Sequence, residues 1–327
     1  MPNDSPERPA PSASNPLHIL QIGRLLPVLE NWLRERYAVE SLDDAPDPAA
    51  FLAERGARFA GVATSAFRGI SAGQIAAMPN LRAVSCFGVG LDKVDLDAAS
   101  ARGIAVGYTP SVLDDCVADT AFALLLDVAR ATPEADRYVR SGGWTQNPGV
   151  FHLGRKVSGA RLGIVGLGRI GKTIARRALG FEMDIRYHAR HPVAEAPWRY
   201  ESSLAELARW ADFLVAITAG GPGTRHLIDA AVLDALGPRG FLINVSRGSV
   251  VDEQALVRAL AEKKIAGAGL DVFENEPHVP AELLGMDNVV LLPHIGSATE
   301  ETRLAMAQRT IDNLDLFFAE GRMISQA

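Results

Sequence analysis

Short apolar runs alternate with amphipathic stretches along most of the chain, and this alternation predicts parallel strands joined by helices. The first third of the sequence contains the first group of such runs. We expect helices there at Leu29–Arg36 and Asp97–Arg102, and strands at Ile19–Ile22, Ala60–Ala63, Ala83–Cys86 and Ile104–Gly107. These segments together predict one α/β unit.

A second group of apolar runs begins after the long helical pattern Cys116–Arg130. The strands expected in it are Arg161–Val165, Asp184–Tyr187, Phe213–Ile217, Phe241–Val245, Ala268–Leu270 and Val289–Leu292. The helices expected between them are Ile170–Leu179, Leu204–Trp210, Ala230–Ala235 and Gln254–Glu262. Six strands joined by helical crossovers are what a dinucleotide-binding sheet requires.

The last helical pattern, Glu300–Phe318, follows the last expected strand, and Thr299 is its expected N-cap. We expect this helix to cross back to the first unit, which would make that unit discontinuous. The 327 residues are enough for two domains, and two domains imply a cleft between them. The expected division is a flexible tail over residues 1–16, a substrate domain over 17–111 plus 298–327, and a dinucleotide-binding domain over 112–297.

Composition narrows the classes of partner. Apolar residues make up 48% and charged residues 22% of the chain, which is usual for a globular protein. The net charge of -6 gives no basic footprint for nucleic acid or for an anionic membrane, and no run approaches the ~20 apolar residues of a membrane span. Cys86 and Cys116 form no metal-binding pattern, so we expect two reduced thiols in a cytoplasmic protein. The expected partner is a small molecule.

The strongest single motif is the glycine-rich segment Gly166–Gly171, which reads GLGRIG between an apolar run and an amphipathic helix. In such a turn Gly166 permits the tight bend, Gly168 lets the backbone approach a diphosphate, and Gly171 lets the helix pack closely on the strand. The amides at the start of the helix would then face the diphosphate. The motif predicts a bound dinucleotide.

The second strand of this sheet ends without the acidic residue that usually binds the ribose 2′-hydroxyl of NAD. The segment Tyr187–His191 reads YHARH and contains no acid. Arg190 can instead pair with a 2′-phosphate, so we expect NADP(H) to be preferred, with NAD(H) possible. His188 and His191 lack neighbouring carboxylate or thiolate ligands, and we expect no metal.

Three ionisable residues follow separate strands of the second group: Arg247, Glu276 and His294. Ligands of open α/β sheets bind beyond the carboxyl ends of the strands, so the three side chains could meet in one place. Taken singly, each has a structural alternative, namely a surface salt bridge, a turn before a proline and a buried core histidine. Their placement after three strands favours a shared site.

The three residue types suit the reduction of a 2-oxo acid. His294 would donate a proton to the carbonyl oxygen while hydride reaches the carbon. Glu276 would fix the tautomer of that imidazole and favour its protonated form. Arg247 would hold the carboxylate of the acid through two parallel hydrogen bonds.

Over nearly its whole length after the tail, the chain resembles the D-isomer specific 2-hydroxyacid dehydrogenase family. The motifs that carry the resemblance are GVGLDKVD (Gly88–Asp95), VADTAFALLL (Val117–Leu126), GLGRIG (Gly166–Gly171), NVSRGSVVDEQAL (Asn244–Leu256), GLDVFENEP (Gly269–Pro277) and LLPHIGSAT (Leu291–Thr299).

The resemblance implies a homodimer whose chains have two Rossmann-like or flavodoxin-like α/β domains with parallel sheets, the active site in the interdomain cleft, and the last helix returning to the first domain. It implies the roles already given to Arg247, Glu276 and His294, and it places the substrate carboxylate on the amides of Val89 and Gly90. The residues that it implies at the cofactor are Thr120, Gly166, Leu167, Gly168, Arg169, Ile170, Gly171, Ala189, Arg190, Ile217, Thr218, Val245, Arg247, Asp271, His294 and Gly296. Asp271 would contact the nicotinamide carboxamide, with a structural role in a turn as the alternative.

Within the family, the missing acid and Arg190 resemble the NADPH-using glyoxylate and hydroxypyruvate reductases, including the plant hydroxyphenylpyruvate reductases. The segment Gly142–Thr145 resembles the same type, in which a tryptophan, here Trp144, reaches the substrate pocket of the partner. The segment Ala219–Gly223 departs from the family, which more often has a proline-containing Leu/Thr stretch. This departure leaves the adenine-side wall unassigned.

The leading hypothesis is the NADPH-dependent reduction of glyoxylate, hydroxypyruvate or a related small 2-oxo acid to the D-2-hydroxy acid. One alternative is an NAD-linked oxidative dehydrogenase, which would usually have an acid in place of Ala189. Another is a dinucleotide-sensing corepressor on the same fold, which the presence of Arg247, Glu276 and His294 disfavours. The sequence leaves open whether Phe87, Leu91, Trp144 and Phe151 shape the pocket for small or for aromatic acids.

Overall fold

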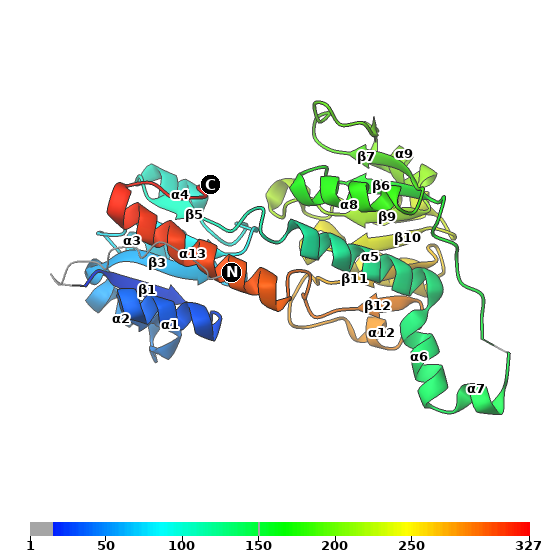
Figure 1. The fold of residues 1–327 in the computed structure, drawn as a ribbon, viewed down its shortest axis with the longest axis horizontal. Coiled ribbons are helices and arrows are strands. Elements are labelled where there is room, and N and C mark those ends of the chain that lie inside the picture. The colour runs from blue at the N-terminus through cyan, green and yellow to red at the C-terminus, as the bar shows by residue number, and fades with distance from the viewer. Residues whose placement is uncertain (1–15, 150) are drawn as a thin grey trace, which may run out of the picture. The chain divides into compact units, whose positions relative to one another are not determined.

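A computed structural model describes residues 16–149 and 151–327, so the tail predicted over residues 1–16 lies outside the described part except for Pro16. The chain divides into two compact units. The first contains the described residues up to Val112 together with Arg303–Ala327, and the second contains Leu113–Thr302. Each unit is built on one parallel sheet with helices on its faces, which confirms the predicted fold class (Figure 1).

The first unit has a five-stranded parallel sheet in the order β2-β1-β3-β4-β5. This is the flavodoxin-like order. Its strands are β1 (His18–Ile22), β2 (Ala38–Ser41), β3 (Phe59–Ser65), β4 (Ala83–Phe87) and β5 (Ala105–Gly107). Its helices before the second unit are α1 (Pro27–Arg36), α2 (Pro48–Arg55), α3 (Ala72–Ala76) and α4 (Leu96–Ala101). The four predicted strands are present, but β2 was not predicted, because it is a four-residue edge strand without a fully buried residue.

The last helix, α13 (Glu300–Glu320), packs on this first sheet from Arg303 onward. The hydroxyl of Ser85 in β4 donates to the carbonyl of Thr310 over 2.8 Å, and the Tyr37 hydroxyl donates to Asp315 over 2.6 Å. At the start of the helix, the Thr299 hydroxyl accepts from the amide of Thr302 over 3.2 Å, which confirms the predicted cap.

The second unit has a seven-stranded parallel sheet in the order β12-β11-β10-β9-β6-β7-β8. Its strands are β6 (Arg161–Val165), β7 (Asp184–His188), β8 (Arg199–Tyr200), β9 (Phe213–Ala216), β10 (Phe241–Asn244), β11 (Gly267–Leu270) and β12 (Val289–Leu291). Its helices are α5 (Asp114–Arg130), α6 (Thr132–Arg140), α7 (Gly143–Gln146), α8 (Arg169–Leu179), α9 (Leu204–Trp210), α10 (Ala230–Leu236), α11 (Glu253–Ala261) and α12 (Ala281–Leu284). The six predicted strands are present, and the two-residue edge strand β8 makes a seventh that the sequence did not predict.

The order of strands in the second sheet reverses between β6 and β9, the two neighbours from which the sheet grows in opposite directions. In Rossmann-type sheets the dinucleotide binds at the carboxyl ends of the strands beside this switch point. The helices bury apolar residues at helical spacing, as α5 does with Val117, Ala121 and Leu125. We therefore expect the cofactor site of this unit at the carboxyl ends of β6 and β9.

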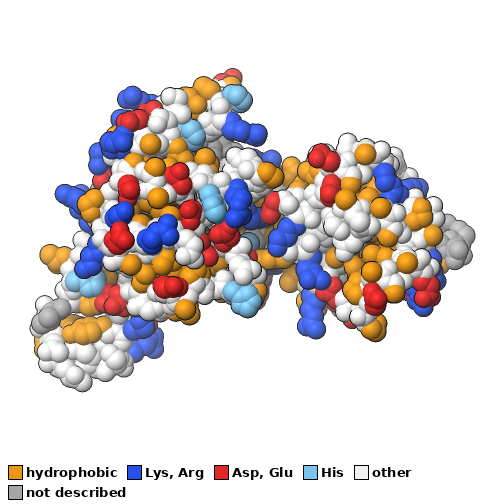
Figure 2. Space-filling view, turned by 180° about the vertical axis from the view of Figure 1, so that it is seen from behind, with side chains coloured by type: hydrophobic (Ala, Val, Ile, Leu, Met, Phe, Trp, Pro, Cys, Tyr) orange, Lys and Arg blue, Asp and Glu red, His pale blue; other side chains and the backbone are white. Residues whose placement is uncertain are grey.

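The surface is mixed in charge. Figure 2 shows acidic and basic side chains intermingled with apolar ones on the face that it displays. Among the described residues, no helix combines the length and the apolar character needed to cross a membrane. In the same part of the chain, no group of three or more His, Cys, Asp or Glu side chains is arranged to hold a metal ion.

Candidate active site

The glycine-rich loop joins β6 to α8 with the geometry that close approach requires. Gly166 has a φ of 102°, in the left-handed region that favours glycine. A side chain at Gly171 would place its Cβ 2.2 Å from the carbonyl oxygen of Gly166, so the helix packs here with no room for one. Gly168 is the N-cap of α8, so no side chain caps the first amides of the helix. A Cβ at Gly168 would have no atom within 4 Å, so the space in front of these amides is open. The exposed amides at this helix start fit a diphosphate.

The other residues expected at the cofactor lie at the carboxyl edge of the same sheet. Ala189 and Arg190 follow β7, Ile217 and Thr218 follow β9, and Val245 follows β10. In α5, the hydroxyl of Thr120 bonds the carbonyls of Cys116 at 3.1 Å and of Gly296 at 3.4 Å. Leu167 is buried, whereas Arg169 is exposed with its guanidinium 3.7 Å from Asp114.

The end of β7 presents Arg190 where an acid would bind the ribose of NAD. Arg190 is exposed at this position. The ring of His188 bonds the carbonyl of Glu201 at 2.9 Å, so this histidine is engaged with the backbone of its own unit. The Tyr200 hydroxyl donates to the carbonyl of Ala189 over 3.2 Å and holds the turn from which Arg190 projects.

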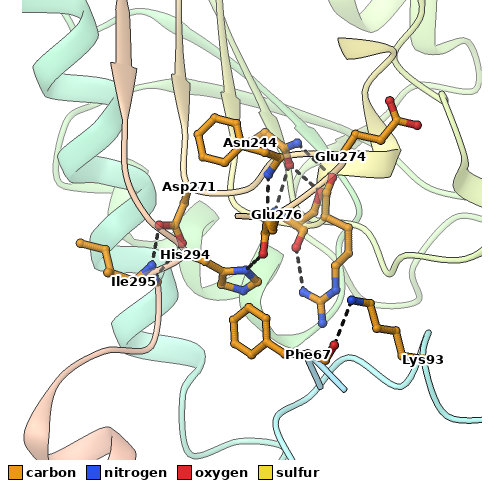
Figure 3. A network of polar contacts seen from close by, with 12 residues as sticks. Phe67, Lys93, Asn244, Asp271, Glu274, Glu276, His294 and Ile295 are labelled. Carbon is orange, nitrogen blue, oxygen red and sulfur yellow. Dashed lines mark hydrogen bonds and ion pairs between the residues drawn. The ribbon is translucent and has the colours of Figure 1, made fainter. Parts of the chain in front are cut away.

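His294 and Glu276 form a direct pair. Nδ1 of His294 lies 2.8 Å from Oε2 of Glu276, and the exposed fractions of the two side chains are 25% and 24% (Figure 3). The other carboxylate oxygen, Oε1, accepts from the amide of Phe273 over 3.0 Å. Burial alone would raise the pKa of Glu276. The hydrogen bond and charge of His294, the Phe273 amide and the charge of Arg247 outweigh it, so the pKa lies below its ordinary value.

Asp271 fixes the turn that carries His294. Its Oδ1 accepts from the amide of Ile295 and its Oδ2 from the amide of Gly296, both over 2.7 Å (Figure 3). The side chain is 2% exposed, and this burial raises the pKa of Asp271 against the opposing effect of the two amides. His294 itself has a φ of 54°, which a non-glycine residue adopts only when its surroundings hold it. The structure thus gives Asp271 the structural role in a turn, and its contact with nicotinamide stays a prediction.

The loop that carries Arg247 is organised by Asn244, a residue without an assigned role in the sequence analysis. Asn244 is 1% exposed, and its Oδ1 accepts from both the amide and the hydroxyl of Ser246, at 3.1 and 2.7 Å. Its Nδ2 donates to the carbonyl of Arg247 over 3.0 Å. The signal that could have identified it is an Asn at the end of a strand, followed two residues later by a serine.

The second unit therefore brings Arg247, Glu276 and His294 to the same edge of one sheet. Arg247 follows β10, Glu276 follows the neighbouring strand β11, and His294 follows β12. The loops also touch directly, because a Cβ on Gly248 would lie 1.9 Å from the carbonyl carbon of Phe273.

The remaining predicted residues, Val89, Gly90 and Trp144, belong to other elements of the chain. Val89 and Gly90 belong to the first unit and follow β4 in a half-buried turn. Gly88 before them has a φ of 144°, and its amide donates to the Thr109 hydroxyl over 3.1 Å. Trp144 lies in α7 of the second unit with 59% of its surface exposed.

Comparison with known proteins agrees with this geometry. The family model described as "D-isomer specific 2-hydroxyacid dehydrogenase, NAD binding domain" matches residues 122–296, which lie within the second unit. Glyoxylate/hydroxypyruvate reductase A of Arabidopsis thaliana is 46% identical over 89% of this chain and 92% of its own. The hydroxyphenylpyruvate reductase of Plectranthus scutellarioides has the same identity and coverage.

The chain belongs to the D-isomer specific 2-hydroxyacid dehydrogenase family. Among solved structures, it is similar to an NADPH-dependent glyoxylate/hydroxypyruvate reductase from Sinorhizobium meliloti in complex with NADP and malonate. The TM-score is 0.90 at 42% identity, with 96% of this chain and 97% of that chain covered. This D-2-hydroxyacid dehydrogenase is an NAD(P)-dependent oxidoreductase that binds a nicotinamide dinucleotide, as the sequence predicts, and the role of the glycine-rich loop in holding it stays a prediction.

Proposed function

We propose that the protein reduces a small 2-oxo acid, such as glyoxylate or hydroxypyruvate, to the D-2-hydroxy acid with NADPH. The observation that carries this proposal is the 2.8 Å pair of His294 and Glu276, with Arg247 after the neighbouring strand of the same sheet. The names of the similar proteins support it, since two of them are glyoxylate/hydroxypyruvate reductases and one of these is called NADPH-dependent.

His294 acts as the proton donor. Because Nδ1 is bonded to Glu276, the proton is delivered to the carbonyl oxygen from Nε2. The lowered pKa of Glu276 keeps its carboxylate ionised, and that charge stabilises the imidazolium form from which the proton leaves.

Arg247 anchors the carboxylate of the substrate. A guanidinium binds both oxygens of a carboxylate in a fixed plane, which sets the orientation of the neighbouring carbonyl. We also assign a substrate-binding role to the amides of Val89 and Gly90, because the glycines on either side of Val89 carry no side chain that would cover them.

The cofactor is held by the glycine-rich loop and by the strand ends that follow β7, β9 and β10. Its nicotinamide supplies the hydride. We assign the 2′-phosphate of NADPH to Arg190, because a forked, charge-assisted contact favours a phosphate where the chain has no repelling carboxylate.

The working assembly is proposed to be a homodimer. In the second unit, Trp144 is 59% exposed, Leu153 is 97% exposed and Val139 is 53% exposed. Large apolar side chains with this exposure are the residues that an interface covers. Light scattering at several concentrations tests the dimer, and a monomer at all of them would contradict it.

A steady-state screen tests the proposed function most economically. Oxidation of NADPH and of NADH is followed with glyoxylate, hydroxypyruvate, pyruvate, phenylpyruvate and 2-ketogluconate, and the configuration of each product is determined. We expect turnover with NADPH to exceed that with NADH and the product to be the D-isomer. The reduction of NAD by the corresponding D-2-hydroxy acids is measured in parallel, and turnover only in that direction would instead support the oxidative alternative. Cofactor binding without turnover of any acid would support a dinucleotide sensor.

A further inference from the structure

A second histidine–carboxylate pair lies beside the pair of His294 and Glu276. Nε2 of His226 is 2.9 Å from Oε1 of Glu274, and the guanidinium of Arg225 is 2.7 Å from the same oxygen. Glu274 precedes Glu276 by two residues, and in Figure 3 its carboxylate is directed away from the imidazole of His294. Its carboxylate therefore binds the segment 225–226.

The backbone of His226 is joined to the loop that carries Arg247. The amide of His226 donates to the carbonyl of Ser249 over 2.8 Å. The amide of Ile228 donates to Val250 over 3.0 Å, and the amide of Asp252 returns to the carbonyl of Ile228 over 3.0 Å. These three bonds form a short parallel ladder, so the chain at 226–228 follows the residues immediately after Arg247.

The loops of Arg247 and Glu276 meet backbone against backbone. A Cβ on Gly248 would lie 1.9 Å from the carbonyl carbon of Phe273 and 2.2 Å from the nitrogen of Glu274. The Glu274 amide donates to Oε1 of Glu253 over 3.1 Å. Glu253 is the first residue of α11, so both the backbone and the side chain of Glu274 are tied to the segments that flank Arg247.

His226 is held in a left-handed conformation, with a φ of 50°. A non-glycine residue in this region is strained and persists when several contacts hold it. Here the contacts are the backbone bond to Ser249 and the side-chain bond to Glu274. This conformation directs the amide of His226 toward Ser249 and its imidazole toward Glu274.

We infer that His226 and Glu274 are positioning residues that clamp the Arg247 loop to the Glu276 loop. His226 reaches the first loop through its amide and the second through its imidazole, so it reinforces the spacing that the backbone contact at Gly248 and the bond from Glu274 to Glu253 also hold. Because the carboxylate anchor and the partner of the proton donor lie on those loops, the spacing determines how well a 2-oxo acid is aligned. This inference rests on the proposed function for its effect on catalysis, whereas the clamp itself is independent of it.

A double-mutant cycle with His226→Ala, Glu274→Ala and the double variant tests the clamp. Each single change is expected to lower kcat/KM for the 2-oxo acid about 10-fold or more, because small errors in alignment are costly. The double variant is expected to be no worse than either single variant, because both changes break the same contact. The Kd for NADPH is expected to stay at the wild-type value, since neither side chain contacts the glycine-rich loop of residues 166–171.

Two further variants separate positioning from a general loss of structure. Glu274→Gln retains an acceptor oxygen and should keep kcat/KM within about threefold of wild type, since a neutral hydrogen bond replaces the charged one. Arg225→Ala removes only the outer ion pair, whose arginine side chain is 58% exposed, and should change kcat/KM less than about twofold. Single variants with wild-type kcat/KM, or losses that multiply in the double variant, would overturn the inference.

Hydrogen exchange gives a readout that does not depend on activity. His226→Ala should speed exchange in both 247–253 and 271–277, with the loop at 166–171 unchanged as an internal control. If the wild-type protein reduced no 2-oxo acid but this paired acceleration appeared, the proposed function would fail while the clamp stood. Unchanged exchange in either segment would overturn the clamp even in an active enzyme.

Discussion

Replacing Glu276 by glutamine keeps the size of the side chain and removes the charge that faces His294. The distance from Nδ1 to Oε2 is 2.8 Å, which is in the range of charge-assisted hydrogen bonds. Hydrogen bonds to charged groups contribute about 1.5–3 kcal/mol. The exposed fractions of the two side chains are 25% and 24%, so water screens the pair little. The full contribution of about 1.5–3 kcal/mol therefore applies to this hydrogen bond. At about 1.4 kcal/mol for each factor of ten, the expected loss is about 10-fold to 100-fold.

We expect this loss in kcat for the 2-oxo acid, because the imidazolium form of the proton donor loses its partner when the charge is removed. The assay is steady-state oxidation of NADPH, with the Kd for NADPH measured by fluorescence titration as the check on cofactor binding. Glu282→Gln, a change in the short helix α12 of the same unit, is the control for the loss of one carboxylate. A Glu276→Gln enzyme whose kcat stays within about twofold of wild type would refute the role of the pair.

Three other changes follow from the site. Arg190→Ala should raise the KM for NADPH about 10-fold to 100-fold, because a charge-assisted contact is lost. The KM for NADH should stay nearly unchanged, and equal effects on the two KM values would contradict the assignment. Gly248→Ala should lower the free energy of unfolding by about 1–3 kcal/mol in denaturant titrations because its Cβ would overlap Phe273, whereas Gly285→Ala, with open space around it, should be neutral. The lowered pKa of Glu276 stabilises the fold above the ordinary glutamate pKa, and this stability is lost as the pH falls through the lowered value. The difference in unfolding free energy between wild type and Glu276→Gln should therefore shrink as the pH is lowered below the ordinary glutamate pKa, and a constant difference there would contradict it.

The sequence predicts the two sheets because their central strands are continuous apolar runs. Strands such as β6 and β10 are buried on both faces, so hydrophobicity alone identifies them. The edge strands β2 and β8 escape prediction since they have only four and two residues and little burial. Their place in the sheet depends on hydrogen bonds to the preceding strand, which short runs with little apolar patterning do not announce.

The sequence also identifies the residues of the pair, since Glu276 and His294 each follow a recognisable strand. It does not reveal what fixes them. The left-handed φ of His294 depends on Asp271, whose two oxygens accept amides from residues 24 and 25 positions away. The bond between His226 and Glu274 spans 48 residues. Contacts over such separations leave no local pattern in composition or periodicity, so only the folded chain shows them.

The most direct test is a single turnover with His294→Asn, started by mixing the NADPH-bound enzyme with glyoxylate and followed by the absorbance of NADPH. If His294 donates the proton that accompanies hydride transfer, the variant binds NADPH as wild type does but oxidises it at least about 100-fold more slowly. NADPH oxidation at the wild-type rate in this variant would show that the proton comes from another group.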